Sequence, residues 1–249
     1  MTADAPRRVA LVADAGRYVG PSLVRELARR GHDLVISNPA DGLVAEVEGL
    51  GSEVVVVDRA HNLARPESAP ALVDAALERF GQLDAAVAFT GSIIGGRFTK
   101  SSIDDLRKLV EGCLEAPYHF LKAVTAPMIE AGSGQVLLMT SAAGARPVPG
   151  APLYSSVRAG ATMLAKNVAD EIAPTGVQVN ALGTNFMDFP EFHDAVGSHD
   201  PEVRKLVEAQ VPMRRMGTVE ECAAFAMAFL DGTSGFTTGQ FVAYAGGWA

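Results

Sequence analysis

Short apolar runs alternate with helical segments along almost the whole chain, and this alternation constrains the fold more than any other feature. Each run is five or six residues long and is followed by turn residues, which is typical of buried strands. The segments between the runs have helical spacing and few helix breakers. The predicted strands are Val9–Ala13, His32–Ser37, Glu53–Asp58, Asp84–Phe89, Gln135–Thr140 and Val177–Leu182.

The predicted helices cover residues 20–30, 66–80, 102–131, 159–172 and 219–230. Strands that alternate with helices predict a parallel sheet with helices on both faces. A chain of 249 residues is a usual length for one such unit. We therefore predict an α/β fold in which a doubly wound parallel sheet forms a Rossmann-like three-layer sandwich, with residues 1–249 as a single domain.

Composition and charge narrow the possible partners. A net charge of −8 argues against nucleic acid and anionic membranes. The two cysteines, Cys113 and Cys222, are too few for a disulfide framework or a zinc site and indicate a reducing compartment. No apolar run approaches the length of a membrane span, and no signal-peptide core is present. We expect a cytoplasmic protein with no bound metal.

The segment from Ser141 to Arg158 carries the residues best suited to chemistry. It follows a predicted strand and leads into a predicted helix, and ligands bind at the carboxyl ends of strands in open parallel sheets. Tyr154 and Arg158 are four residues apart and share one helix face. The arginine cation stabilises a phenolate, while the serine hydroxyl can hydrogen-bond the same substrate oxygen. A surface Tyr–Arg pair would be structural, but the spacing from Ser141 favours catalysis.

These three residues give the whole chain a resemblance to the short-chain dehydrogenases/reductases, whose catalytic centre reads Ser…Tyr-x-x-x-Lys. Arg158 stands in place of that lysine. The Ser…Tyr…Arg variant resembles the halohydrin dehalogenases, which are lyases that work on this fold without a nucleotide. The resemblance implies a homotetramer that acts on vicinal haloalcohols, epoxides and small anions. Cys113 stands where the reductases carry a catalytic asparagine and is expected to pack in the core.

The loop after the first strand departs from the nucleotide-binding pattern. A nucleotide-binding relative would read Thr-Gly-x-x-x-Gly-x-Gly over residues 13–20. Asp14 and Tyr18 occupy the first two glycine positions, where a carboxylate repels a phosphate and a phenol ring fills its space. Halohydrin dehalogenases carry Thr-x4-Phe/Tyr-x-Gly here, which Tyr18 and Gly20 match and Ala13 does not. We therefore expect no cofactor.

The loop after residues 177–182 is the second candidate binding element. Such a loop can aim backbone N–H groups at an anion, and neighbouring aromatic rings suit a large, weakly hydrated halide. By resemblance, the halide site comprises Tyr18, Thr184, Asn185, Phe186 and Met187. The substrate pocket is expected to include Phe89, Ile93 and Phe189. The hydrophobic lid of an ordinary reductase would give the same pattern and stays an alternative.

Three residues near the C-terminus are expected to lie outside the chemistry. His193 and His199 fall in a polar stretch without metal-ligand spacing, which predicts solvent exposure. Trp248, the only tryptophan, is expected from the resemblance to pack near a neighbouring subunit's active site. The leading hypothesis is a cofactor-free lyase. The alternatives are an NAD(P)-dependent short-chain reductase with an eroded glycine loop and a catalytically silent sensor on the same fold.

Overall fold

The computed structural model describes residues 7–249 and contains a sheet of seven parallel strands. The strand order is β3-β2-β1-β4-β5-β6-β9. Strands β2 and β3 are added on one side of β1, and the strands from β4 onward are added on its other side, as in doubly wound sheets. All six predicted runs form strands, and a seventh comes from the C-terminal tail. The strands are β1 Arg8–Ala13, β2 His32–Ile36, β3 Val54–Val56, β4 Ala85–Phe89, β5 Gly134–Ser141, β6 Val177–Thr184 and β9 Phe241–Tyr244.

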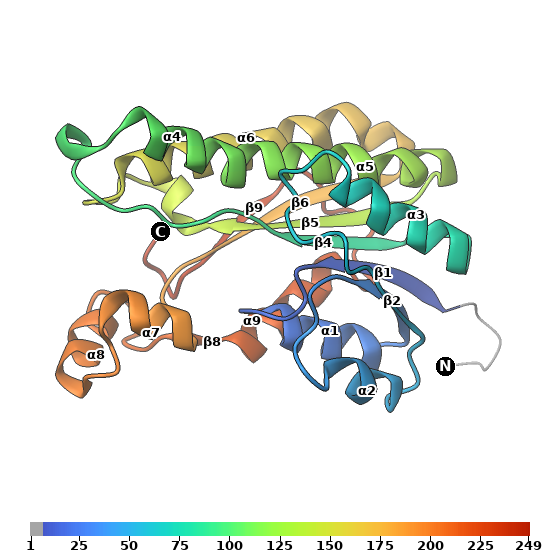
Figure 1. Ribbon diagram of the computed structural model, residues 1–249, viewed down its shortest axis with the longest axis horizontal. Coiled ribbons are helices and arrows are strands. Elements are labelled where there is room, and N and C mark those ends of the chain that lie inside the picture. Colours follow the sequence, from blue (N-terminus) through green and yellow to red (C-terminus); the bar gives the residue numbers. More distant parts are fainter. Residues whose placement is uncertain (1–6) are drawn as a thin grey trace.

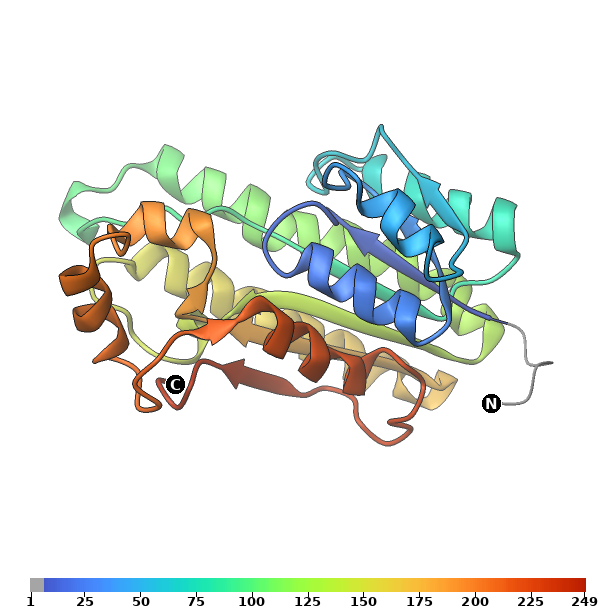
Figure 2. The same ribbon diagram turned by 90° about the horizontal axis from the view of Figure 1, so that it is seen from below.

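Helices cover both faces of this sheet (Figure 1). Four lie on one face: α3 Ser68–Phe80, α4 Ile103–Val110, α5 Ala116–Ala131 and α6 Pro152–Ile172. Three lie on the other face: α1 Gly20–Arg29, α2 Leu43–Glu48 and α9 Val219–Ala226. Figure 2 shows α1 and α9 side by side beneath the sheet. The predicted three-layer sandwich is therefore confirmed. In residues 7–249, no helix is both long and apolar enough to cross a bilayer.

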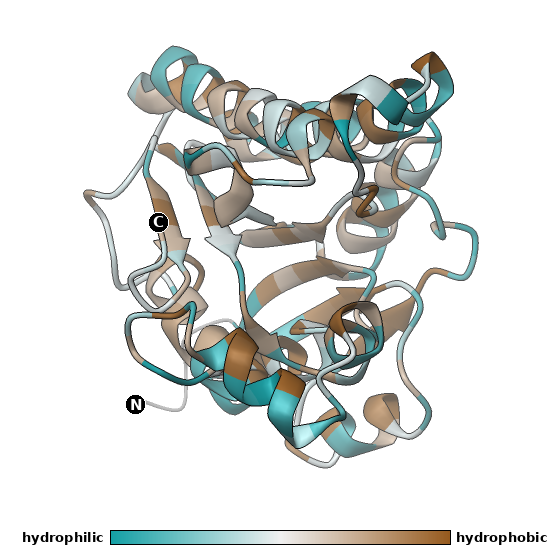
Figure 3. Ribbon diagram, turned by 90° about the vertical axis from the view of Figure 1, so that its left-hand side faces the viewer, coloured by the Kyte–Doolittle hydropathy of each residue, from teal (hydrophilic) through white to brown (hydrophobic). Residues whose placement is uncertain are grey.

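The central strands are mainly apolar because both faces of the sheet are covered. Every residue of β5 is buried, as are all but the first residue of β1 and all but the last of β4. Figure 3, which looks along the sheet from the left of Figure 1, shows mainly hydrophobic strands between the two helix layers. Continuous burial explains why the sequence shows unbroken apolar runs instead of alternation.

The helix expected over residues 102–131 is present but contains a break in its regular spacing. A π-helical turn at Glu111–Glu115 joins α4 to α5. Ser102 begins the helix with a capping box, since its Oγ accepts the Asp105 N–H at 3.1 Å while the Asp105 carboxylate accepts the Ser102 N–H at 2.8 Å. Turns of this kind are frequent at functional sites, and this one carries Cys113.

A small cap lies beyond the carboxyl ends of the central strands, between β6 and α9 (Figure 1). Its two short strands pair in parallel, with Met187 opposite Gly217 and Asp188 opposite Thr218. The cap comprises β7 Met187–Asp188, α7 Pro190–Val196, α8 Pro201–Glu208 and β8 Gly217–Thr218.

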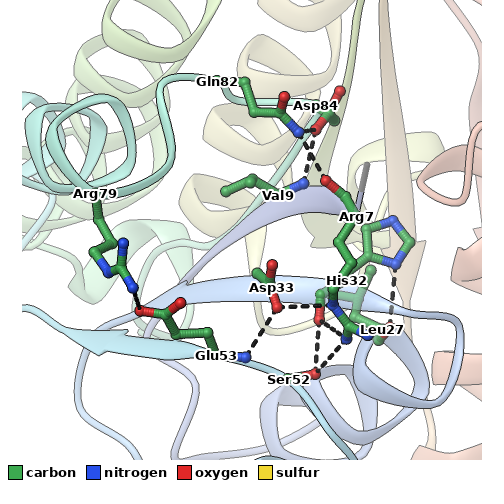
Figure 4. Close-up of polar contacts among 10 residues, drawn as sticks. All are labelled: Arg7, Val9, Leu27, His32, Asp33, Ser52, Glu53, Arg79, Gln82 and Asp84. Atoms are coloured by element: carbon green, nitrogen blue, oxygen red, sulfur yellow. Dashed lines mark hydrogen bonds and ion pairs between the residues drawn. The ribbon is translucent and has the colours of Figure 1, made fainter. Parts of the chain in front are cut away.

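The opposite edge of the sheet, where the strands begin, is held by charged side chains (Figure 4). Arg7 donates to Asp33 at 2.9 Å, and the same carboxylate oxygen accepts the Glu53 N–H at 2.9 Å. The Asp84 carboxylate accepts the Val9 N–H at 2.7 Å. These contacts tie β1 to β2, β3 and β4 and leave the carboxyl edge for ligands.

Candidate active site

Ser141 and Tyr154 border one buried cluster at the carboxyl edge. Ser141 ends β5, and its Oγ accepts the Ala143 N–H at 3.1 Å and donates to the Thr184 carbonyl at 3.4 Å. Tyr154 lies in the first turn of α6 and packs in the same cluster as Ala143. Both side chains are 7% exposed. The strand and the helix therefore hold a hydroxyl and a phenol in a site that is largely shielded from water.

Arg158 lies one helical turn beyond Tyr154 and is an almost fully buried cation, 5% exposed. Its guanidinium carbon is 5.1 Å from the centre of the Tyr154 ring. Within residues 7–249, its Nε and Nη1 have no hydrogen-bond partner. Gly91 makes room for it, since a Cβ there would lie 2.8 Å from Nη2. A buried charge without a partner is costly, and in this site the cation lies over the Tyr154 ring.

Cys113 lies on the π-helical turn and is completely buried. Its sulfur faces the Ser92 carbonyl at 3.7 Å. Burial raises the pKa of the thiol, although the Arg158 charge opposes the shift. The thiol is therefore protonated at neutral pH, and it serves neither as a nucleophile nor as a counter-ion.

Tyr18 reaches across the carboxyl edge from the loop after β1 to the end of β6. Its hydroxyl meets Thr184 Oγ1 at 2.6 Å. Its ring lies 4.5 Å from the ring of Phe189 and 6.2 Å from that of Phe89. Burial raises the pKa of the Tyr18 hydroxyl, with the nearby Cys222 adding to the shift, so the group stays protonated and can donate a hydrogen bond. The Tyr18 O–H donates to Thr184 Oγ1, and this bond holds the hydroxyl beside aromatic rings.

The loop after β6 places the other expected halide residues around Phe186, whose φ of 53° lies in the left-handed region. Two of its backbone N–H groups are paired inside the protein. The Phe186 N–H donates to Asn185 Oδ1 at 2.9 Å, and the Asn185 N–H donates to the Tyr244 carbonyl at 3.4 Å. These two N–H groups are therefore not free to bind an anion as expected, because the Asn185 side chain and β9 supply their acceptors. Asn185, Phe186 and Met187 instead line a cavity of about 400 Å³ together with Tyr244.

The structure brings together two of the three residues expected in the substrate pocket. Phe89 and Phe189 both lie against Tyr18. Ile93 does not join them: its side chain is 73% exposed, because the chain after β4 runs outward as an irregular loop. Trp248 packs against Phe186 of its own chain, with ring centres 5.5 Å apart. The expectation that it serves a neighbouring subunit has no support in these contacts.

A second cavity, of about 370 Å³, lies over the carboxyl ends of β1 and β4, where the strand order reverses. Its lining includes Asp14, His61, Phe89 and Gly91. In an open parallel sheet a dinucleotide would run from such a cavity along the strand ends. Here Asp14 places a carboxylate at the start of that path and Tyr18 crosses it. The residues present do not fit a dinucleotide diphosphate.

The loop keeps the backbone of a glycine-rich turn although the glycines are replaced. Asp14 and Tyr18 have φ values of 63° and 55°, which glycine adopts readily and other residues rarely do. Asn38 supports Asp14, donating from Nδ2 to its carboxylate at 3.3 Å. Side chains therefore stand where a nucleotide-binding loop has glycine, while the course of the chain is retained.

Sequence reasoning missed His193. The expectation of solvent exposure is confirmed for His199 but wrong for His193, which is 8% exposed. Both nitrogens of its ring are hydrogen-bonded, to Asp188 and to Ser198. The equal five-residue spacing of Asp188 and Ser198 on either side of His193, directly after a segment rich in phenylalanine, is the signal that could have found it. Residues 7–249 contain no group of three His, Cys, Asp or Glu side chains placed to hold a metal.

Comparisons of the sequence and the structure with known proteins identify relatives of this chain. A family model described as enoyl-(acyl carrier protein) reductase matches residues 15–249. A 3-oxoacyl-[acyl-carrier-protein] reductase from Synechocystis sp. is 30% identical over 249 residues, covering 96% of both chains. A xylitol dehydrogenase with NAD+ bound has a TM-score of 0.88 at 24% identity, covering 96% of this chain and 98% of the other. ElxO with NADP bound has a TM-score of 0.88 at 18% identity, covering 98% and 99%.

Proposed function

The chain belongs to the short-chain dehydrogenase/reductase family, and within this family we propose that it is a cofactor-free halohydrin dehalogenase. Its reaction would convert a vicinal haloalcohol into an epoxide, a halide ion and a proton. The reverse reaction would open epoxides with small anions such as azide, cyanide or nitrite.

The observation that carries this proposal is the position of Tyr18. Its side chain stands at a glycine position of the nucleotide-binding loop, and its hydroxyl reaches Thr184 at 2.6 Å. A side chain that bridges the ends of β1 and β6 obstructs a dinucleotide along the sheet edge. To bind a halide, the same hydroxyl would turn its proton from Thr184 Oγ1 to the anion, and the rings of Phe89 and Phe189 would supply an apolar wall.

The residues of β5 and α6 supply the proton chemistry. Ser141 donates a hydrogen bond to the substrate hydroxyl oxygen and holds it in place. The Tyr154 phenolate takes the proton of that hydroxyl, while Arg158 stabilises the negative charge on the phenolate. The alkoxide oxygen then forms a bond to the neighbouring carbon from the rear. The carbon–halogen bond breaks and its electron pair leaves with the halide, so the products are an epoxide, a halide ion and a proton on Tyr154.

The leaving group would depart into the pocket beside Tyr18. Holding the oxygen and the halogen on opposite sides of the reacting carbon supplies orientation, which is a large part of the rate in intramolecular reactions. The Tyr18 O–H, turned toward the halogen, would stabilise the negative charge that develops on it. The buried rings around it disfavour hard, strongly hydrated anions and tolerate chloride and bromide.

An NAD(P)-dependent reductase is the second candidate, and two observations favour it. The relatives named above are reductases and dehydrogenases, so the comparisons support this alternative more directly than the lyase. A cavity of about 370 Å³ also persists at the switch point of the sheet. Against it stand Asp14 and Tyr18 on the diphosphate path and Cys113 in place of the family's asparagine.

Halide release from a small vicinal bromoalcohol, with no nucleotide added, tests the proposal. We expect release that saturates with substrate, acidifies the medium in equal amount and falls by at least about a hundredfold in Tyr154→Phe, because the general base is lost. Tyr118→Phe is the matched control, since Tyr118 is exposed on α5 and contacts Lys122.

Full activity in Tyr154→Phe would show that the assigned base is wrong. Nucleotide-dependent carbonyl reduction without halide release would favour the reductase. A folded protein that neither releases halide nor consumes NADPH would favour the catalytically silent sensor.

A further inference from the structure

The cap contains a polar chain centred on the buried His193 and Ser198, and this chain plays no part in the chemistry described above. Its other members are partly exposed. His193 Nε2 lies 2.7 Å from Asp188 Oδ1, and its Nδ1 lies 2.7 Å from Ser198 Oγ. The second carboxylate oxygen of Asp188 accepts from Arg204 Nη2 at 2.6 Å. Arg204 is held in turn by Glu208, whose Oε1 accepts from Nε at 2.9 Å. The chain therefore links β7, α7, the following turn and α8.

Every member of this chain is satisfied, so it holds its geometry firmly. Hydrogen bonds from His193 and Arg204 outweigh burial and lower the pKa of Asp188, which keeps the carboxylate charged. The Ser198 hydroxyl can either donate or accept. It can therefore satisfy His193 Nδ1 whether that nitrogen carries a proton or not, and the chain is preserved in either state of the ring.

The chain is attached to Phe189 through Asp188, which precedes Phe189 directly. The Phe189 carbonyl accepts the backbone N–H of His193 at 3.2 Å, a bond of the first turn of α7 that does not involve the imidazole. The Phe189 ring lies 4.5 Å from the ring of Tyr18. Tyr18 in turn has a left-handed backbone, so the direction of its side chain depends on what packs against it. A shift at the β7–α7 junction would pass through this ring contact to the Tyr18 hydroxyl.

We infer that His193 is a positioning residue: through Asp188 and Phe189 it sets where the Tyr18 hydroxyl stands in the halide pocket. The inference rests on the proposed function for the ligand, a halide or a similar small anion. His193 itself does not touch the reacting atoms. Its contribution lies in the affinity for the anion and the efficiency of ring closure.

The chain offers a matched control at His199. This histidine pairs with Asp194 Oδ1 at 2.8 Å, at the same five-residue separation as His193 and Asp188. Its side chain and that of Asp194 are 63% and 72% exposed. The two pairs therefore differ mainly in burial. The rings of His193 and His199 lie 5.3 Å apart, so loss of this ring contact is common to both deletions and the control accounts for it.

The experiment measures bromide affinity from the quenching of Trp248, together with kcat and KM for a bromoalcohol. Trp248 is the sole tryptophan and packs on Phe186 beside the pocket. We expect His193→Ala to weaken bromide binding and lower kcat/KM about tenfold, because small misplacement of a binding group is costly. Ser198→Ala should act in the same direction more weakly, and His193→Gln should recover part of the loss. His199→Ala should match the parent protein.

A double-mutant cycle separates positioning from general loosening of the fold. If His193 acts through Tyr18, then His193→Ala should change the bromide affinity less than about twofold in a Tyr18→Phe background. Equal losses in both backgrounds, or equal effects of His193→Ala and His199→Ala, would overturn the inference. So would a folded His193→Ala with unchanged affinity and kcat/KM.

A parent protein that neither binds bromide nor releases halide would contradict the proposed function itself. The positioning inference then has a separate readout in the near-ultraviolet circular dichroism of Tyr18, taken as the difference from Tyr18→Phe. The contact with Phe189 fixes the Tyr18 ring, so His193→Ala should reduce this signal and His199→Ala should leave it unchanged. An unchanged signal in His193→Ala would refute the inference.

Discussion

The decisive single residues are those that place a side chain on a backbone shaped for glycine. Asp14 and Tyr18 keep left-handed φ angles in the loop after β1, at a cost of about 1 kcal/mol or more each. The contacts of Tyr18 with Phe189 and Thr184 offset that strain. A loop that binds diphosphate with its backbone can thus become a pocket wall by changing side chains alone, without altering the fold around it.

His32 gives a prediction about pH and stability. Arg8 Nε donates to His32 Nε2 at 3.3 Å, so the ring proton sits on Nδ1 and faces the Leu27 carbonyl at 3.1 Å (Figure 4 shows the latter contact). Burial, together with the Arg8 charge, lowers the pKa of this ring below its ordinary 6.5. Below pH 6.5 the His32 ring becomes protonated in the unfolded chain, while in the folded chain it stays neutral to lower pH. The free energy of unfolding should therefore fall as the pH falls, by at most about 1.4 kcal/mol per pH unit for this one group.

Urea denaturation between pH 8 and pH 5 checks this, with His32→Gln as the comparison. The stability advantage of the parent over the variant should shrink steadily below pH 6.5. An advantage that stays constant over this range would show that His32 does not carry the effect.

Sequence reasoning located residues whose role depends on local spacing and missed those whose role depends on burial. Tyr154 and Arg158 share a helix face at any depth, so their pairing was predictable, and the structure places them 5.1 Å apart. Their assigned roles stay predictions. The burial of His193 depends on how α7 folds back onto Asp188, and the even spacing of Asp188 and Ser198 around it was the one local signal of that burial. Ile93 shows the reverse error, because an apolar residue in a loop need not face a pocket.

Among the elements, strands that are covered on both faces were the easiest to predict. Their apolar runs are continuous and sharply bounded, and β2, β4 and β6 match the predicted runs to within two residues at each end. Strands β7 and β8 have only two residues each and leave no pattern. The π-helical turn at Glu111–Glu115 was not predictable either, since the single glycine in this segment is also tolerated inside an ordinary α-helix.

The helix that carries this turn gives the second stability prediction. Ser102→Ala removes the capping box of α4 and should lower the free energy of unfolding by about 1 kcal/mol. Ser156→Ala is the control, because Ser156 is exposed inside α6 and donates to the Pro152 carbonyl of its own helix. Equilibrium denaturation should show no loss for the control. Equal losses in the two variants would mean that the cap contributes nothing specific.

For the whole molecule, the two candidate functions make opposite predictions about which ligand stabilises the fold. A ligand that binds only the native state raises the free energy of unfolding, by about 2.7 kcal/mol at a hundred times its Kd. For a chain of this length that corresponds to a rise in Tm of about 5–10 °C. If Tyr18 and its aromatic neighbours form an anion pocket, bromide and azide should produce such a rise in a saturable way, while NADPH should produce none.

Tyr18→Phe separates pocket binding from general salt effects. This change removes the O–H donor and keeps the ring, so it should reduce the bromide-induced shift without affecting the small, linear response to sulfate at equal ionic strength. The opposite result would be a rise in Tm on adding NADPH together with a bromide response no larger than that of sulfate. It would mean that the nucleotide reaches the sheet edge despite Tyr18. The molecule would then be a reductase that tolerates a side chain where its relatives keep glycine.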